Sequence, residues 1–400
     1  MLYLRAIYNI SMKIKRAYKF RLVPKPQQRV SMAQTAGCAR LVWNKGLELE
    51  QKALECKEKR NGFAGLCKQV TAWKKDDPTA FLKLVHSQPL QQICKDLDRA
   101  VKDGLDKKSP KKFPGFKRKN QHDSFRYPQG FKFEDRKIFL PKIGWVKFIK
   151  SQEIEGTPKN ITVSKRAGEW YVSVQVEQEI PDPIHPNEEY EVGIDLGIAR
   201  FATISNGNIL KPHNSYRKHE KKLAKEQKSL SRKKKGSNNR LKQKHKIQRL
   251  HKKIADSRLD YLHKSTTWIA KNHGKVVLED LKIANMSKSA KGNPQKPGKN
   301  VSAKSGLNKS ILDQGWFEFK RQLEYKLNWL GGELVLVNPR YTSQRCNTCG
   351  YVDKENRKTQ AKFICKSCGH EDNADNNAAL NILAAGHVVS ACGDISSVAS

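Results

Sequence analysis

The sequence of 400 residues predicts a mixed fold class, in which an all-helical part and an all-β part are followed by an α/β part. Three observations lead to this prediction. Apolar residues recur at helical spacing early in the chain, and in the middle of it they alternate with polar residues. In the second half, short apolar runs of strand length are separated by longer stretches with helical spacing. A chain of this length can hold two or three domains, each with its own core.

The composition predicts a polyanionic partner. The chain has 78 Lys and Arg against 39 Asp and Glu, a formal net charge of +39, which is far more than solubility requires. No stretch approaches the roughly 20 apolar residues of a membrane-spanning helix. We therefore expect nucleic acid as the partner, no membrane partner, and a cytoplasmic protein of the bacterial nucleoid. Nine cysteines, five of them outside any CxxC pair, favour a reducing compartment over a disulfide framework.

The chain begins with residues 1–11, which we interpret as an extension upstream of the fold, because a basic run opens only at Met12. A short basic strand is predicted from Lys15 to Val23, where a Pro-Lys-Pro stretch ends it. Apolar residues at intervals of three and four then predict a helical domain over residues 27–120.

Hairpin strands are predicted between residues 125 and 180, where apolar and polar residues alternate. Turns at Ile143-Gly144 and Ala167-Gly168 separate these strands. We expect a small antiparallel β-barrel made of residues 12–26 and 121–182. The helical domain would be inserted after the first strand of this barrel.

The α/β part is predicted at residues 187–340 and 371–385, after a Pro-rich linker. Residues 285–310 have no apolar period and are rich in Lys, Ser, Gly and Asn, so we expect a mobile loop there. Residues 386–400 are expected to be a disordered tail. The elements predicted by the apolar runs are strands at 190–196, 201–205, 208–211, 275–281 and 333–337, a helix at 316–330, and a short helix from Asp375.

The most basic stretch of the protein covers residues 211–260, with 19 Lys or Arg against four acidic residues. An apolar stripe through Ile247, Leu250 and Ile254 predicts two antiparallel helices with cationic outer faces, broken near Gly236. A solvated helical hairpin without a partner is the alternative. The density of positive charge favours contact with phosphates.

Four cysteines predict a structural zinc site. Cys346, Cys349, Cys365 and Cys368 give the spacing C-x2-C-x15-C-x2-C, in residues 341–370. Each pair is typical of a tight knuckle that directs two thiolates to one tetrahedral ion. A glycine directly follows each pair, where such a turn often needs a positive φ. Because all four positions are filled by protein, we expect this Zn to be structural and not catalytic.

Three acidic residues stand out by their positions in predicted elements. Asp195 and Glu279 each lie near the end of an apolar strand, where a charge is hard to explain by packing. Asp375 begins the last helix. Taken singly, each has an ordinary explanation: a strand-end turn residue, a charge at the rim of the fold, or a helix N-cap.

The order of the elements joins these carboxylates into one site. Three strands, helices, a strand with an acid, a helix, a strand and a final helix with an acid is the order of an RNase H-like sheet. In that fold the strand ends and the last helix would bring the three side chains together. Such a cluster would hold two Mg²⁺ (or Mn²⁺) ions and hydrolyse phosphodiesters.

The chain resembles the TnpB (OrfB) nucleases of bacterial insertion sequences, relatives of type V CRISPR effectors. The resemblance covers about residues 12–385. The motifs that carry it are residues 113–117, 193–197, 278–281 with 285–286, 322–326, 342–344 leading to the first cysteine pair, and Asp375-x-Asn377-Ala378-Ala379-x-Asn381-Ile382.

The resemblance implies an RNA-guided DNA endonuclease that cuts beside a short target-adjacent motif. It implies a RuvC-like nuclease domain with Asp195, Glu279 and Asp375 as the metal-binding triad, and a zinc-containing segment that binds target nucleic acid. The barrel would be a wedge-like domain and the helical part a recognition domain. The implied partners are a guide RNA from the transposon end and double-stranded target DNA, and we expect a monomer bound to its RNA. Glu371 and Asp372 also lie near Asp375, so the choice of Asp375 depends on the motif register.

Two other functions would explain part of the sequence. A non-catalytic zinc-ribbon protein that binds DNA and assists or regulates transposition would explain the charge and the cysteines, but would leave the three carboxylates without a purpose. A transposase that joins DNA ends would use the same metal chemistry. Strand-transfer products in place of double-strand breaks would favour it.

Overall fold

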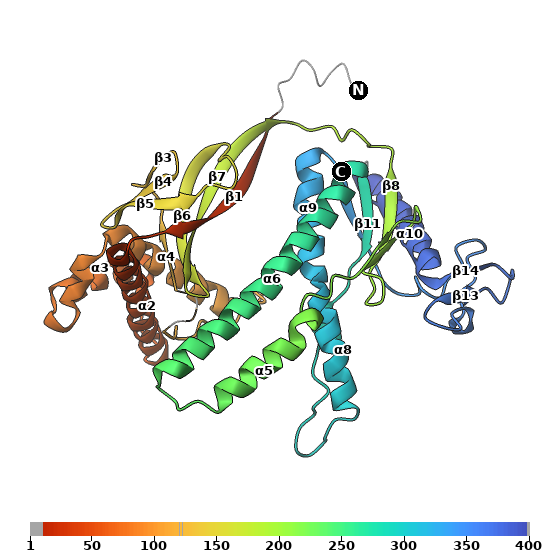
Figure 1. The fold of residues 1–400 in the computed structure, drawn as a ribbon. Helices are drawn as coiled ribbons and strands as arrows, with labels where there is room; N and C mark the ends of the chain where they lie inside the picture. The colour runs from red at the N-terminus through yellow and green to blue at the C-terminus, as the bar shows by residue number, and fades with distance from the viewer. Residues whose placement is uncertain (1–10, 120, 122, 398–400) are drawn as a thin grey trace. The chain divides into compact units, whose positions relative to one another are not determined.

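The computed structural model describes residues 11–119, 121 and 123–397. The chain divides into two compact units, Met1–Pro181 and Asp182–Ser400, and each has hydrophobic cores of its own. Figure 1 shows their helices and strands. Of the predicted extension at residues 1–11, only Ser11 lies within the described residues, and it begins a strand. Within residues 11–119, 121 and 123–397, no helix is both long enough and apolar enough to cross a membrane.

The β part of the first unit is a seven-stranded antiparallel sheet in the order β2-β6-β7-β1-β5-β4-β3. Alternate side chains such as Val172, Val174 and Val176 of β7 are fully buried, which explains the alternating sequence pattern. The early basic strand β1 pairs with β7 and β5, as expected. The strands are β1 (Ser11–Val23), β2 (Ser124–Tyr127), β3 (Lys132–Glu134), β4 (Lys137–Leu140), β5 (Gly144–Ile149), β6 (Thr157–Arg166) and β7 (Glu169–Pro181).

This sheet is open, so the expected closed barrel is corrected to a half-barrel. The edge strands β2 and β3 do not pair with each other in the described residues. Helix α2 (Pro26–Glu55) contributes Met32 and Ala36 to the core of the sheet. A helix therefore covers part of the core that further strands would cover in a closed barrel.

In sequence, the helices of the first unit follow β1 and precede β2. Besides α2 they are α3 (Gly62–Lys75), the 3-10 helix η1 (Asp77–Leu84) and α4 (Ser87–Leu105). Their apolar faces form a second core, which includes Trp43, Leu47 and Leu97. The predicted helical character ends at Leu105, and the residues that follow up to β2 have no helix or strand in the described chain.

The second unit contains a five-stranded sheet in the order β10-β9-β8-β11-β12. The three strands β8, β11 and β12 are parallel, and β9 and β10 are antiparallel to their neighbours. One face packs against α6 and α9, and the other packs against α10. The elements are β8 (Glu191–Asp195), β9 (Ala202–Ile204), β10 (Ile209–Leu210), α6 (Asn238–Asn272), β11 (Lys275–Glu279), α9 (Trp316–Leu330), β12 (Glu333–Val337) and α10 (Ala374–Ser397).

Helix α10 lies very close to the sheet. A Cβ atom at Gly193 would lie 2.2 Å from the carbonyl oxygen of Ala379, so only glycine allows this approach. A Cβ at Gly386 would likewise meet Val277 of β11 at 2.5 Å. These contacts fix the start of α10 relative to the ends of β8 and β11.

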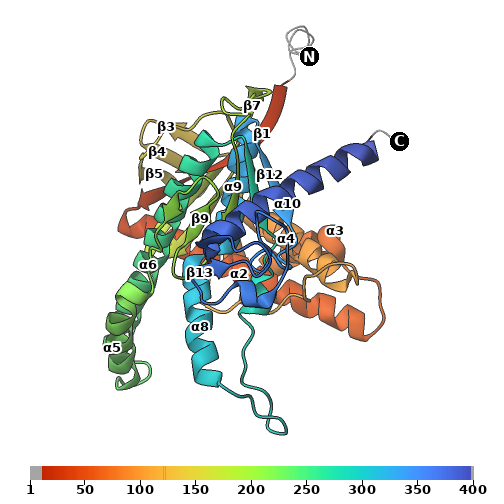
Figure 2. The same cartoon turned by 90° about the vertical axis from the view of Figure 1, so that its right-hand side faces the viewer.

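Two predictions of irregular structure are wrong in part. The expected mobile loop at 285–310 begins within α7 (Ile283–Met286) and contains most of α8 (Val301–Gln314). The expected disordered tail is helical up to Ser397, because α10 continues beyond its packed turns, as Figure 2 shows; residues 398–400 lie outside the described chain. Helix formation is cooperative, so a turn added to a packed helix needs no apolar contacts of its own.

The basic stretch folds as the predicted helical hairpin. Helices α5 (Glu220–Ser231) and α6 pack through Leu223, Ile247 and Ile254. The Ser237 hydroxyl accepts a hydrogen bond from the Arg240 backbone N–H at 3.2 Å and caps α6. Helix α6 continues to Asn272, where its last turns join the main core of the unit.

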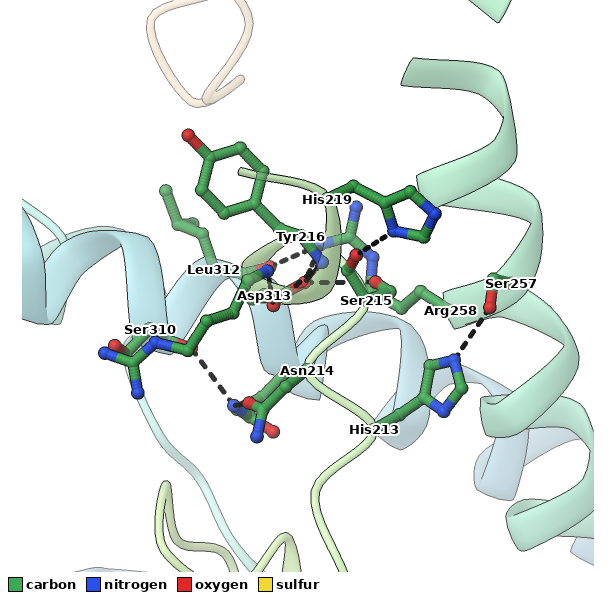
Figure 3. A network of polar contacts seen from close by, with 12 residues as sticks. His213, Asn214, Ser215, Tyr216, His219, Ser257, Arg258, Ser310, Leu312 and Asp313 are labelled. Atoms are coloured by element: carbon green, nitrogen blue, oxygen red, sulfur yellow. Dashed lines mark hydrogen bonds and ion pairs between the residues drawn. The ribbon is translucent and has the colours of Figure 1, made fainter. Parts of the chain in front are cut away.

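A buried aspartate ties the hairpin to α8 (Figure 3). The Asp313 carboxylate accepts hydrogen bonds from Ser215 Oγ at 3.1 Å and from the backbone N–H groups of Tyr216 and Arg217 at 2.9 Å and 3.3 Å. The Arg258 guanidinium lies 3.7 Å away. Only 4% of the Asp313 side chain is exposed. The carboxylate of Asp313 therefore holds the segment that leads into α5.

Replacing Asp313 with alanine is expected to lower the free energy of unfolding by about 2–4 kcal/mol, because buried donors lose their acceptor. Chemical denaturation of the full chain measures the loss. The matched control is Asp260→Ala on α6, whose side chain is 61% exposed and pairs with Lys264. That change should cost less than about 1 kcal/mol. Equal losses in the two variants would contradict a structural role for the Asp313 contacts.

Candidate active site

Two of the three predicted carboxylates lie at the same edge of the sheet. Asp195 is the last residue of β8 and Glu279 the last residue of β11. The two strands are parallel neighbours, with Ile194 opposite Leu278. Asp195 and Glu279, one residue further along these strands, therefore lie side by side at the edge of the sheet.

The third carboxylate comes from the first turn of α10. Asp375 is the second residue of this helix, and its backbone N–H donates to the Asn373 side chain at 3.1 Å. At Gly193, two residues before Asp195, the backbone of α10 packs directly against β8. The packing of α10 on the sheet therefore brings Asp375 to the strand ends.

Asp195 is affected by the charges of the other two carboxylates. Burial raises the pKa of Asp195 to about 7; the negative charges of Glu279 and Asp375 contribute to this increase, and the positive charge of Arg357 opposes it. Burial also raises the pKa of Glu279, while a hydrogen bond from the Thr342 hydroxyl opposes that increase. Thr342 Oγ1 lies 2.5 Å from Glu279 Oε1. The site concentrates negative charge that a cation would stabilise.

The donor set fits a hard divalent cation. Carboxylate oxygens are the protein ligands that Mg²⁺ and Mn²⁺ prefer. The sheet edge therefore offers three oxygen ligands of the kind that these ions prefer.

Glu371 and Asp372 do not take the place of Asp375. Both belong to β14 (Glu371–Asn373), which pairs with β13 (Lys362–Ile364). Glu371 pairs with Lys362 at 3.4 Å, and Asp372 accepts from the Asn376 side chain at 2.8 Å. The influence on the pKa of Asp195 comes from Asp375. The geometry therefore favours Asp375, the residue that the motif register also selects.

Arg357 is a site residue that the sequence analysis missed. Its guanidinium lies 3.3 Å from Asp375 Oδ1, and it also donates to the Gln360 carbonyl at 3.0 Å. It comes from the segment between the two cysteine pairs, directly after the 3-10 helix η3 (Lys354–Asn356). Several basic residues lie in that segment, and neither periodicity nor spacing distinguishes Arg357 from the others. Its contact with Asp375 is recognised only in the folded structure.

The four cysteines gather as a zinc site requires. The Sγ atoms of Cys346 and Cys368 are 3.7 Å apart, and those of Cys349 and Cys365 are 3.5 Å apart. A tetrahedral ion with Zn–S bonds of about 2.3 Å places its sulfurs roughly 3.8 Å apart. Gly350 and Gly369 have φ values of 76° and 71°, as the knuckle turns predict. The cluster therefore fits one Zn²⁺.

Two asparagines of α10 fasten the first knuckle to the helix that carries Asp375. Asn377 is fully buried; its Oδ1 accepts from the Asn347 backbone N–H at 3.0 Å, and its Nδ2 donates to the Arg345 carbonyl at 2.8 Å. Asn381 donates to the carbonyls of Arg345 and Thr342 at 2.7 Å and 3.0 Å. Both asparagines belong to the sequence motif, and the structure shows the hydrogen bonds that they make.

Comparisons with known proteins agree with this architecture. The OrfB_IS605 family, described as a probable transposase, matches residues 171–290, and the Cas12f1-like TNB domain matches residues 316–382. A protein of Escherichia coli (strain K12) with the provisional name RNA-guided DNA endonuclease InsQ is 51% identical over 386 residues, 96% of this chain and 95% of its own length. The chain belongs to the TnpB (OrfB) family. The resemblance predicted from the motifs is therefore confirmed.

Other members and relatives of the family extend this result. A protein of Streptomyces pristinaespiralis, provisionally named RNA-guided DNA endonuclease, is 36% identical over 96% of this chain and 92% of its own length. The cryo-EM structure of a Cas12f1–sgRNA–target DNA complex matches with a TM-score of 0.56 at 15% identity, covering 92% of this chain and 98% of that one. This likeness shows a shared fold.

A third family match describes residues 12–59 as a helix-turn-helix domain. The structure has strand β1 and one continuous helix, α2, in most of this region. Helix α2 is bounded by Pro26 and Glu55, with no break between them. The family match therefore extends to residues 12–59. The local structure, a strand and one long helix, differs from a helix-turn-helix.

Proposed function

We propose that this protein is an RNA-guided DNA endonuclease of an insertion sequence, with a RuvC-like catalytic domain formed by residues 187–340 and 371–385. The observation that carries the proposal is the convergence of three carboxylates, two from neighbouring parallel strands and one from a helix N-terminus. It is supported by the 51% identity with a relative named as such an enzyme.

Asp195, Glu279 and Asp375 would hold Mg²⁺ or Mn²⁺, which supplies an activated water and stabilises the leaving oxygen of a phosphodiester. Thr342 orients Glu279 through its hydroxyl. Arg200 donates to the Asn373 side chain at 3.0 Å and so steadies the turn before α10.

Arg357 would act on the substrate. Its ion pair with Asp375 leaves the guanidinium 27% exposed at the site. The exposed part of the guanidinium would donate to an oxygen of the scissile phosphate, for which its planar fork is suited.

The positive charge of the chain would neutralise nucleic-acid backbones without reading sequence. The half-barrel of residues 12–26 and 121–182 would be the wedge-like domain, and residues 27–120 the recognition domain. Together they would hold the guide RNA and read the target-adjacent motif. Residues 341–370 would contact the target. The helical hairpin would lie along the RNA–DNA duplex with exposed cations that include Lys221, Lys222, Lys225, Lys242, Lys244, Lys246 and Arg249.

A plasmid-cleavage assay tests the proposed function. The protein is purified with co-expressed RNA from the transposon end, and that RNA is sequenced to define the guide. Linear product is expected with a matching plasmid and Mg²⁺, and none with EDTA or with a mismatched plasmid. Binding without cleavage under all metal conditions would support a non-catalytic DNA-binding protein instead. Strand-transfer products would support a transposase.

A further inference from the structure

Tyr341, the residue before the Glu279 partner Thr342, is an exposed aromatic residue with a strained backbone. Tyr341 has φ of 67°, a left-handed conformation that bulky residues rarely adopt. It lies in the turn that follows β12, and 46% of the residue is exposed. Packing in a core therefore does not explain why a tyrosine stands where glycine or asparagine would be less strained.

The turn around Tyr341 is firmly held. The Tyr341 carbonyl accepts from the backbone N–H groups of Gln344 and Arg345 at 2.9 Å and 3.0 Å. The next residue, Thr342, is buried and donates to Glu279, while its carbonyl accepts from Asn381. Tyr341 is thus one residue from a side chain that contacts the predicted metal ligand, and the backbone that carries its exposed ring is held in place.

A guanidinium accompanies the ring. The Arg340 Cζ atom lies 4.7 Å from the centroid of the Tyr341 ring, and an Arg340 amino group donates to the Tyr341 hydroxyl at 2.9 Å. The Arg340 backbone N–H donates to the Asn338 side chain at 3.0 Å, which fixes the start of the turn. An exposed aromatic ring with a neighbouring cation is the combination that binds single-stranded nucleic acid by stacking a base and neutralising its phosphate.

We propose that Tyr341, supported by Arg340, is a stacking platform for one base of the DNA strand that enters the carboxylate site. It is a positioning residue: it holds the nucleotide so that the adjoining phosphodiester reaches Asp195, Glu279 and Asp375. This inference rests on the proposed nuclease function. The bound chemistry is a nucleobase of a single strand, without preference for its sequence, because every base has an aromatic face.

The test uses the protein with its co-expressed RNA and a matching DNA in which 2-aminopurine replaces successive bases of each strand near the cut. Fluorescence in Ca²⁺ reports binding, and single-turnover cleavage in Mg²⁺ reports positioning. We expect strong quenching at one position with the wild type and with Tyr341→Phe. With Tyr341→Leu and Tyr341→Gly the quenching should disappear and cleavage should slow by about 10-fold to about 100-fold, the range produced by the loss of one stacked base.

Two further arms separate stacking from folding. Glycine adopts a φ of 67° without strain, so Tyr341→Gly should melt at the same temperature as the wild type or higher. An abasic nucleotide at the quenched position should remove the difference in cleavage rate between the wild type and Tyr341→Leu.

The outcomes distinguish the platform from the nuclease function. Quenching that depends on Tyr341 in a protein that does not cut would support the platform and overturn the proposed function. Mg²⁺-dependent cutting at equal rates by the wild type, Tyr341→Leu and Tyr341→Gly would overturn the platform and leave the function standing. The absence of quenching at every position tested would also overturn the platform.

Discussion

Replacing Asp195 with asparagine is expected to lower the rate of DNA cleavage by roughly a thousand-fold or more, because losing about 4 kcal/mol of metal-dependent stabilisation has that effect. Binding of RNA and target should persist, since the cationic surfaces are unchanged. Asparagine matches the shape of aspartate but carries no charge. Because burial and the charges of Glu279 and Asp375 raise the pKa of Asp195 to about 7, removing this charge should not destabilise the metal-free protein.

Three measurements together test this expectation: single-turnover cleavage, binding of the labelled target, and the melting temperature with and without Mg²⁺. The wild type should gain thermal stability with Mg²⁺, as a protein does when a ligand binds its native state, and Asp195→Asn should gain much less. Wild-type cleavage by Asp195→Asn would rule out the triad assignment.

Asp280 offers a matched control, because it directly follows Glu279 and lies on the same sheet edge. Its carboxylate pairs with Lys282 and with Lys320, and hydrogen bonds from these lysines lower its pKa to about 2. Asp280→Asn should leave the cleavage rate within about twofold of the wild type, because exposed ion pairs contribute little. A loss equal to that of Asp195→Asn would mean that total acidic charge, and not the geometry of the triad, supports cleavage.

The sequence places two carboxylates at strand ends, as the structure does, and a charge at the end of an apolar run has few structural explanations. Asp195 and Glu279 are both of this kind. Arg357, Thr342 and Asn377 act through contacts between segments distant in sequence. Spacing rules describe neighbours on one helix or strand, so they cannot identify such contacts.

Helix α8 shows why a helix can lack a recognisable pattern. Its buried residues are Ile311, Asp313 and Gln314, so two of the three are polar. Leu307 and Leu312 are exposed. Hydrophobic periodicity therefore carries no signal for this helix, and a composition rich in Lys, Ser and Asn favours the interpretation as a loop.

The open sheet of the first unit has a different cause. Alternating residues identify strands correctly, but they do not say whether the edge strands meet. Helix α2 places Met32 and Ala36 in the core of the sheet, and this contact between helix and sheet is absent from the local pattern of either element.

Replacing Cys365 with serine is expected to remove zinc and to reduce cleavage by about 100-fold or more. Cys365 is 2% exposed and shares a small core with Cys346, Phe363 and Ala374, the residue directly before Asp375. Binding of a structural Zn²⁺ contributes about 10 kcal/mol or more in small zinc domains, so its loss unfolds them. Here the ribbon is inserted in the larger unit, so we expect local unfolding that includes the start of α10.

Zinc content by mass spectrometry, hydrogen exchange of the first turns of α10, and Mg²⁺-dependent thermal stabilisation measure the linked losses. The matched control is Cys56→Ser, which changes an exposed cysteine of the first unit and should keep zinc and activity. If the ribbon served only as a nucleic-acid contact, Cys365→Ser would weaken DNA binding and keep the Mg²⁺ response. Loss of that response together with zinc would show that the ribbon positions Asp375, through the Ala374 contact and the hydrogen bonds of Asn377.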